Sequence, residues 1–89
     1  MMIFLDGSLM TDKAAAHDRL ACQLGLPAWY GRNLDALYDM LTGHIAPCHL
    51  VLIHEARMLE QLGGYGERLM DTLRDAAEET PGITLTEMA

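Results

Sequence analysis

The hydrophobic pattern of the chain alternates between short apolar runs and longer segments with helical spacing. The short runs are continuous apolar stretches or alternate with Thr, which predicts β-strands. They lie at about residues 2–5, 49–53 and 83–88. In the longer segments apolar residues recur three or four positions apart, which predicts helices that bury one face. These segments are about residues 12–24, 34–43, 55–62 and 66–79.

Capping residues predict where the first two helices begin and end. Thr11 or Asp12 can cap the first helix, and Gly25 can stop it. Asn33 can cap the second helix, because its side-chain oxygen can accept a hydrogen bond from a free backbone N–H of the first turn. Gly43 can end that helix, as glycine often does at a helix C-terminus.

The order of elements predicts the fold. Gly63-Gly64 separates the third helix from the fourth, and Pro81-Gly82 ends the fourth. Strands joined through helices predict a three-stranded, mostly parallel sheet with right-handed crossovers. A chain of 89 residues fits one compact domain, residues 1–89. We therefore expect a single α/β domain in which about four helices pack against a small sheet.

The charge balance limits the classes of partner. The chain has 13 acidic residues against six basic ones and a net charge of −7. Such a chain is not expected to bind nucleic acid directly, because phosphate contacts require an excess of Lys and Arg. Anionic membrane surfaces are disfavoured for the same reason. The charge favours a basic protein partner, although an acidic surface that only confers solubility remains an alternative.

Cys22 and Cys48 are the only cysteines, and they form no CxxC or other metal-type spacing. Two cysteines in this length do not predict a disulfide framework, so we expect free thiols in a reducing compartment. The sequence shows no signal-peptide pattern and no apolar run of membrane-spanning length. Together these features predict a cytoplasmic protein.

The second predicted helix carries an acidic face. Its apolar face consists of Leu34, Leu37, Met40 and Leu41. Asp35 and Asp39 lie on the opposite side, one helical turn apart, together with Tyr38 and Thr42. Like charges at this spacing destabilise an isolated helix by about 0.2–0.5 kcal/mol. Arg32 is the only basic residue close by. We expect that it can form an ion pair with Asp35.

Aromatic residues surround these two carboxylates. They are Trp29, Tyr30, Tyr38 and His44. Aromatic side chains next to charged ones are typical of the residues that dominate the energy of protein interfaces. Two acids one turn apart can also imitate the phosphate spacing that the Arg and Lys side chains of a nuclease recognise. An ordinary solvated helix face with locally packed aromatics is the alternative.

Residues 26–43 resemble the signature of the barstar family, which consists of intracellular inhibitors of barnase-type ribonucleases. The central motif is Tyr-Gly-x-Asn-Leu-Asp-Ala-Leu-x-Asp at residues 30–39. The resemblance extends over nearly the whole chain, from the first apolar run to the closing one at residues 83–85. It implies a small parallel sheet with helices and a protein that inserts its second helix and the preceding loop into the active site of a ribonuclease.

The resemblance also implies a set of partner-binding residues. Asp39 is expected to be the main anchor, in contact with the basic phosphate-binding cluster of the enzyme, and Asp35 to bind beside it. Asp75 on the fourth helix resembles a further acidic contact, through an alignment that needs a one-residue gap. The surrounding contacts are expected to be Trp29, Tyr30, Gly31, Asn33, Leu34, Tyr38, Thr42, Gly43 and His44.

Several positions depart from the family pattern. Tyr38 and His44 stand where tryptophans are expected, and Arg32 replaces an acid. Met40 occupies a cysteine position, and neither cysteine of this chain matches one of the family. The acidic anchors match the family pattern, whereas the residues around them differ. This combination suggests that the partner is a related but different ribonuclease. An immunity or regulatory protein of the same fold that acts on a different toxin or nuclease is the alternative.

Other residues carry weaker hypotheses. His44, His49 and His54 recur every five residues, but they are expected on a loop and at the two ends of a strand, so the sequence predicts no metal site. Cys48 and His49 should point apart along a strand, which argues against a nucleophile with its base. The chain shows no cofactor motif and is expected not to be an enzyme. His17, on an apolar helix face, is expected to be a buried histidine with satisfied hydrogen bonds.

Overall fold

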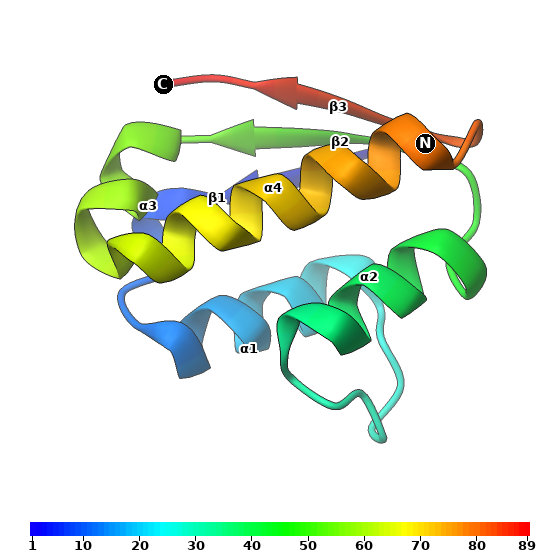
Figure 1. Ribbon diagram of the computed structural model, residues 1–89, viewed down its shortest axis with the longest axis horizontal. Helices are drawn as coiled ribbons and strands as arrows, with labels where there is room; N and C mark the ends of the chain where they lie inside the picture. The colour runs from blue at the N-terminus through cyan, green and yellow to red at the C-terminus, as the bar shows by residue number, and fades with distance from the viewer.

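The computed structural model describes residues 1–89 and confirms the α/β fold (Figure 1). Three parallel strands and four α-helices follow the predicted order, with one additional 3-10 turn, η1, after the first strand. The elements are β1 (Met2–Asp6), η1 (Gly7–Leu9), α1 (Lys13–Leu24), α2 (Leu34–Gly43), β2 (Cys48–Ile53), α3 (Glu55–Leu62), α4 (Gly64–Glu79) and β3 (Ile83–Glu87).

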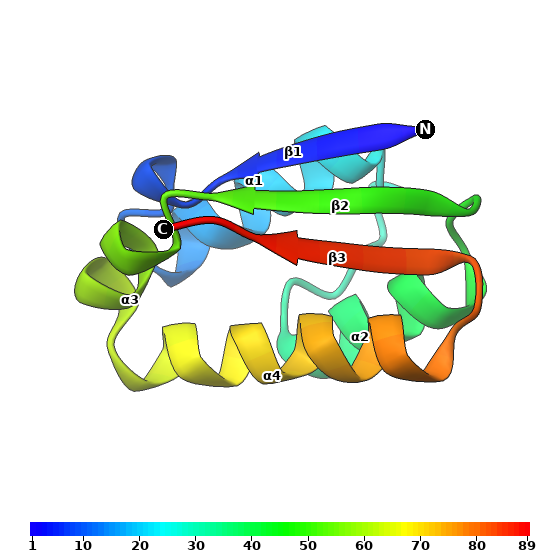
Figure 2. The same cartoon turned by 90° about the horizontal axis from the view of Figure 1, so that it is seen from above.

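The three strands lie side by side in the order β1-β2-β3, and the helices cover one face of the sheet (Figure 2). In register, Phe4 of β1 pairs with Val51 of β2, which pairs with Thr86 of β3. Helix α1 packs against β1, and α4 packs against β3. Helix α2 packs on α4, so that α2 is the helix farthest from the sheet.

Side chains alternate between the two faces of the sheet, as the strand pattern requires. Leu5, Leu50 and Leu52 are fully buried beneath the helices, whereas Met2 and Phe4 on the outer face are more than half exposed. The core also contains four of the seven methionines, which can fill irregular gaps because they are flexible. These buried methionines are Met10, Met40, Met58 and Met70.

The residues that flank α1 confirm the predicted ends of this helix. The Asp12 side chain accepts a hydrogen bond from the backbone N–H of Ala15, so Asp12 rather than Thr11 is the cap. Gly25 follows α1 in the left-handed conformation, with φ of 64°. Helix α4 begins at Gly64, two residues earlier than expected, because the chain reverses at Gly63 alone.

Both cysteines are free thiols, as expected: Cys22 is exposed and Cys48 is buried on the inner face of β2. The sequence did not reveal the turn η1, in which the Asp6 carboxylate accepts hydrogen bonds from the backbone N–H and the hydroxyl of Ser8. None of the helices combines the length and the apolar character that a membrane span requires.

Candidate partner-binding surface

Helix α2 presents its two aspartates to solvent. Asp35 and Asp39 are exposed, whereas Leu37 and Met40 on the opposite face are buried in the core. Neither aspartate takes part in an ion pair; every acidic partner in the ion pairs of the molecule lies outside α2. The amphipathic pattern therefore places both carboxylates on the outer side of the outermost helix, without a compensating cation.

Asn33 fixes the junction between the loop and α2. Its Oδ1 atom accepts a hydrogen bond of 2.8 Å from the backbone N–H of Ala36, which is the predicted cap. Its Nδ2 atom donates to the carbonyl of Gly31 at 3.3 Å. A Cβ atom at Gly31 would lie 3.1 Å from the Cβ of Ala36, so a side chain there would crowd the first turn. Asn33 therefore connects the loop to the helix in one defined geometry.

Tyr30 connects the same loop to the core through His17. The Tyr30 side chain is 5% exposed, and its hydroxyl lies 2.7 Å from Nδ1 of His17. On the other side of the ring, Nε2 lies 2.6 Å from the hydroxyl of Tyr65 on α4. His17 is thus the buried histidine with satisfied hydrogen bonds that the sequence predicts. Tyr30 is thus the buried member of the expected set, and its hydrogen bond to His17 positions the loop.

The surroundings of His17 favour the neutral imidazole. Burial lowers the pKa of His17, and the positive charges of Arg32 and Lys13 lower it further. Burial also raises the pKa of Tyr30 and of Tyr65, so both phenols remain protonated near neutral pH. A neutral imidazole has one N–H donor and one acceptor nitrogen, so one hydroxyl accepts a hydrogen bond from the ring and the other donates to it.

Two aromatic rings meet where the loop approaches the end of α2. Trp29 in the loop is 68% exposed and meets His44, which follows α2, with ring centroids 5.7 Å apart and planes at 79°. This edge-to-face contact brings the loop and the end of the helix together. Within α2, the Thr42 hydroxyl donates to the carbonyl of Tyr38 at 2.8 Å, which orients Thr42 along the helix. Two exposed rings therefore lie where the loop meets the C-terminal end of α2.

Arg32 does not pair with Asp35, contrary to the expectation from the sequence. Its guanidinium forms an ion pair with Asp18 on α1 instead. The backbone of Arg32 has a φ of 54°, in the left-handed region that non-glycine residues rarely adopt. The turn at this residue was not visible in the sequence, and Asp18 is available only because α1 lies beside the loop.

The remaining residues expected to bind a partner differ in exposure. Asp75 is exposed on α4, the helix against which α2 packs. The exposed members of the expected set are Trp29, Gly31, Asn33, Asp35, Asp39, Gly43, His44 and Asp75. Leu34, Tyr38 and Thr42 are half-buried. Most of the set therefore lies on the loop and on helix α2, which together form one continuous stretch of chain.

Comparison with known proteins places the chain in a family. A family model described as Barstar (barnase inhibitor) matches residues 1–86. The chain belongs to the barstar family. It is also 38% identical over 78 residues to a protein of Bacillus subtilis (strain 168) named "Putative ribonuclease inhibitor YrdF". The match covers 86% of this chain and 86% of that relative.

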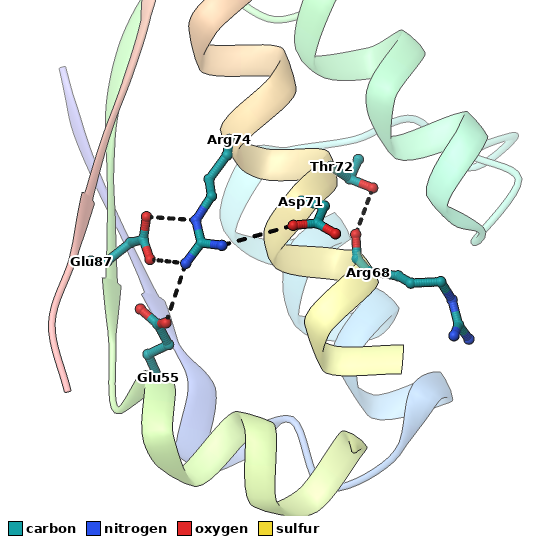
Figure 3. Close-up of polar contacts among 6 residues, drawn as sticks. All are labelled: Glu55, Arg68, Asp71, Thr72, Arg74 and Glu87. Carbon is teal, nitrogen blue, oxygen red and sulfur yellow. Dashed lines mark hydrogen bonds and ion pairs between the residues drawn. The ribbon is translucent and has the colours of Figure 1, made fainter. Parts of the chain in front are cut away.

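Within this barstar-family fold, a second polar cluster joins α3, α4 and β3 (Figure 3). Arg74 donates to both carboxylate oxygens of Glu87, from Nε at 3.0 Å and from Nη2 at 2.6 Å. The same guanidinium lies 3.7 Å from Glu55 and 3.8 Å from Asp71. Hydrogen bonding to Arg74 lowers the pKa of Glu87, whereas burial and the neighbouring Glu87 raise the pKa of Glu55. No motif in the sequence indicates this cluster, because its members come from three separate elements.

The three histidines considered as metal ligands lie at separate places. His44 contacts Trp29, whereas Nε2 of His49 lies 2.6 Å from the Thr86 hydroxyl on the outer face of the sheet. His54 precedes α3 with a φ of 56°. No group of three or more His, Cys, Asp or Glu side chains is arranged to hold a metal ion. These three histidines therefore do not form one site.

Proposed function

We propose that this chain inhibits a barnase-type ribonuclease by occluding its basic active site with helix α2 and the loop before it. Asp39 contacts the cationic cluster that binds RNA phosphates, and Asp35 binds beside it. The chain itself catalyses no reaction in this proposal. It acts in the cytoplasm, a compartment that suits its two free thiols.

One observation carries the proposal: both carboxylates of α2 are exposed and have no cationic partner within the molecule. A carboxylate that already has an intramolecular ion pair must give it up to bind a partner, whereas these two need only lose water. A basic cleft would attract them over a long range and accelerate association. The family membership and the relative named as a ribonuclease inhibitor support the same choice of partner.

The surroundings of the two aspartates suit such a contact. Trp29 and His44 are exposed and can exclude water from the rim of the interface. The loop is held at both ends, by Tyr30 in the core and by Asn33 at the start of α2. A surface that is ordered before binding loses less conformational entropy when it docks.

The test is inhibition of a panel of small basic microbial ribonucleases by wild-type protein, Asp39→Asn and Glu60→Gln. Glu60 is an exposed carboxylate on α3 without an ion pair, so Glu60→Gln removes the same charge away from the proposed surface. We expect stoichiometric, salt-sensitive inhibition that Asp39→Asn weakens and Glu60→Gln retains. Equal loss in the two variants would refute the assignment of the site to α2.

A second candidate is an immunity or regulatory protein that binds a different toxin or nuclease. The observation that favours it is the cation in the binding loop, Arg32, which a uniformly basic enzyme surface would repel. Pull-down from the native host with wild-type protein and Asp39→Asn discriminates the two candidates. Capture of a nuclease outside the barnase type, only by the wild-type protein, would favour this candidate.

A further inference from the structure

A hollow with basic walls lies beside the loop that leads into α2. It has a volume of about 330 Å³ and is lined by Lys13, Ala14, His17 and Arg32. No carboxylate lines it, although the chain has 13 acidic residues against six basic ones. Both ring nitrogens of His17 already have tyrosine partners, so the positive charges available in the hollow are those of Lys13 and Arg32.

A third cation lies close to this hollow. Lys13 Nζ lies 5.0 Å from the centre of the Tyr65 ring, and the guanidinium carbon of Arg68 lies 5.6 Å from the same centre. Lys13, Arg32 and Arg68 are all exposed, and they are half of the basic residues of the chain. We refer to these three residues as the basic corner. Arg32 is paired with Asp18, whereas Lys13 and Arg68 have no ion pair in this acidic protein of net charge −7.

The backbone of Arg32 provides an independent observation. Its left-handed φ of 54° is unfavourable for a long side chain, and such conformations gather at functional sites. The conformation accompanies the ion pair with Asp18 on α1, and the Arg32 side chain nevertheless remains 47% exposed. The guanidinium is thus held at the wall of the hollow while its outer side faces solvent.

The basic corner is continuous with the proposed binding surface. Arg32 stands between Gly31 and Asn33, which both belong to the expected contacts, and Asn33 caps the helix that carries Asp35. A partner that covers Gly31 and Asn33 therefore comes next to Arg32, whose guanidinium lies at the edge of this surface, beside Asp18 of α1. Like charges facing each other across an interface are costly, whereas opposite charges select the partner.

We propose that the basic corner receives an acidic side chain, Asp or Glu, on the same protein that binds α2. This inference rests on the proposed function and specifies the partner: its basic active site lies next to a carboxylate at the rim. The inhibitor then has an acidic contact at Asp35 and Asp39 and a basic contact at Arg32 and Lys13. Ribonucleases whose rim is basic at this position are excluded by repulsion.

The first experiment tests the corner without a nuclease. The full-length ¹⁵N-labelled protein is titrated at low salt with the peptide Ac-Glu-Glu-Glu-NH₂ and, separately, with inorganic phosphate. We expect the peptide to shift the amide resonances of Lys13 and Arg32. In the Lys13→Glu variant these shifts should be lost. Absence of shifts at these residues would refute the proposal. Phosphate shifts larger than those with the peptide would also refute it, because the corner would then be a general anion site.

The second experiment uses any panel ribonuclease that the wild-type protein inhibits in an Asp39-dependent manner. We expect Arg32→Glu to weaken inhibition at least 10-fold and Arg32→Asn to weaken it less, because Asn removes the charge but tolerates the left-handed backbone. Asp18→Asn should strengthen inhibition, because it releases Arg32 from its intramolecular ion pair. Arg57→Glu, an exposed charge reversal on α3, should have no effect.

The outcomes separate the two proposals. Unchanged or stronger inhibition by Arg32→Glu would overturn the assignment of an acidic rim and leave the inhibitor function intact. If no ribonuclease is inhibited, the proposed function fails, and the peptide titration still decides whether the basic corner binds carboxylates. Circular dichroism of Arg32→Glu and Arg32→Asn establishes that both variants are folded.

Discussion

The Nδ1 atom of His17 lies 2.7 Å from the hydroxyl of Tyr30, and this hydrogen bond connects helix α1 to the loop before α2. The opposite ring nitrogen bonds the hydroxyl of Tyr65 on α4. Three segments of the chain therefore meet at one buried imidazole. Because Tyr30 is flanked by the exposed residues Trp29 and Gly31, the position of the loop before α2 depends on this contact.

Replacing His17 with Phe should destabilise the protein. The substitution leaves two phenol hydroxyls without the imidazole partner, and an unsatisfied buried polar group costs about 1–3 kcal/mol. Urea unfolding at pH 7 measures the loss. Cys22→Ser, on an exposed position of the same helix, is the control and should change the free energy of unfolding by no more than about 0.5 kcal/mol. A His17→Phe variant as stable as the control would contradict the structural role of the imidazole.

The stability of the wild-type protein should fall as the solution is acidified below about pH 6.5. Burial lowers the pKa of His17 from 6.5, so the unfolded chain takes up a proton on this imidazole at a higher pH than the native protein does. Between the two pKa values the unfolded state binds more protons, and stability rises with pH. The contribution is complete above pH 6.5 and is lost as the pH falls through the native pKa.

The same variant tests the pH dependence. Urea unfolding at pH 7, 6 and 5 should show a steeper decline for the wild-type protein than for His17→Phe over this interval. Because the remaining titratable groups are shared by the two proteins, the difference between their profiles isolates the imidazole. Parallel profiles would contradict a lowered pKa for His17.

Asn33→Ala should weaken the start of helix α2. The variant loses the hydrogen bond of 2.8 Å from the Ala36 N–H, and loss of such a cap costs about 0.5–2 kcal/mol. Asn33→Ser retains a capping oxygen and is the matched control. Thermal unfolding measures both variants, and we expect Ser to lie closer to the wild-type protein than Ala. The reverse order would mean that the side chain does not act as a cap.

Local chemistry explains which parts of this structure were predictable from the sequence. Asp12 and Asn33 cap helices whose N–H groups are three residues away, and Gly25 ends a helix through its own backbone conformation. The carboxylates of α2 face solvent because the helical repeat of about 3.6 residues places them on the side opposite the apolar residues of the helix. None of these features requires knowledge of the tertiary structure.

Contacts between distant segments were not predictable in this way. The His17–Tyr65 hydrogen bond joins residues 48 positions apart, and the Arg32–Asp18 ion pair depends on how the loop passes α1. The sequence predicted that His17 is buried but gave no means of choosing its partners. Likewise, Arg74 can contact Glu55 and Glu87 together only after β3 has paired with β2.

Arg74→Gln should destabilise the end of β3. Glu55 and Glu87 would remain close together without a cation, although the partial exposure of Arg74 limits the cost to about 1 kcal/mol. Adding Glu55→Gln to this variant removes the repulsion and should recover part of the loss. Chemical denaturation of the four proteins of this double-mutant cycle measures the coupling. Additive effects would show that the Arg74 cluster does not act as a unit.

Asp39→Asn should make the isolated protein slightly more stable. Asp35 and Asp39 are like charges one helical turn apart, an arrangement that costs an isolated helix about 0.2–0.5 kcal/mol, and neither has an ion pair that would compensate. Asn differs little from Asp in helix propensity, so removal of the repulsion should dominate.

The gain in stability should be larger at low salt, because salt screens repulsion between exposed charges. Urea unfolding of Asp39→Asn, Glu60→Gln and the wild-type protein at two salt concentrations measures this difference. A variant that is more stable and yet weaker as an inhibitor would show that Asp39 is retained for binding at a cost in stability. If Asp39→Asn instead destabilises the fold, the aspartate has a structural role, and loss of inhibition in this variant could no longer be assigned to a lost contact.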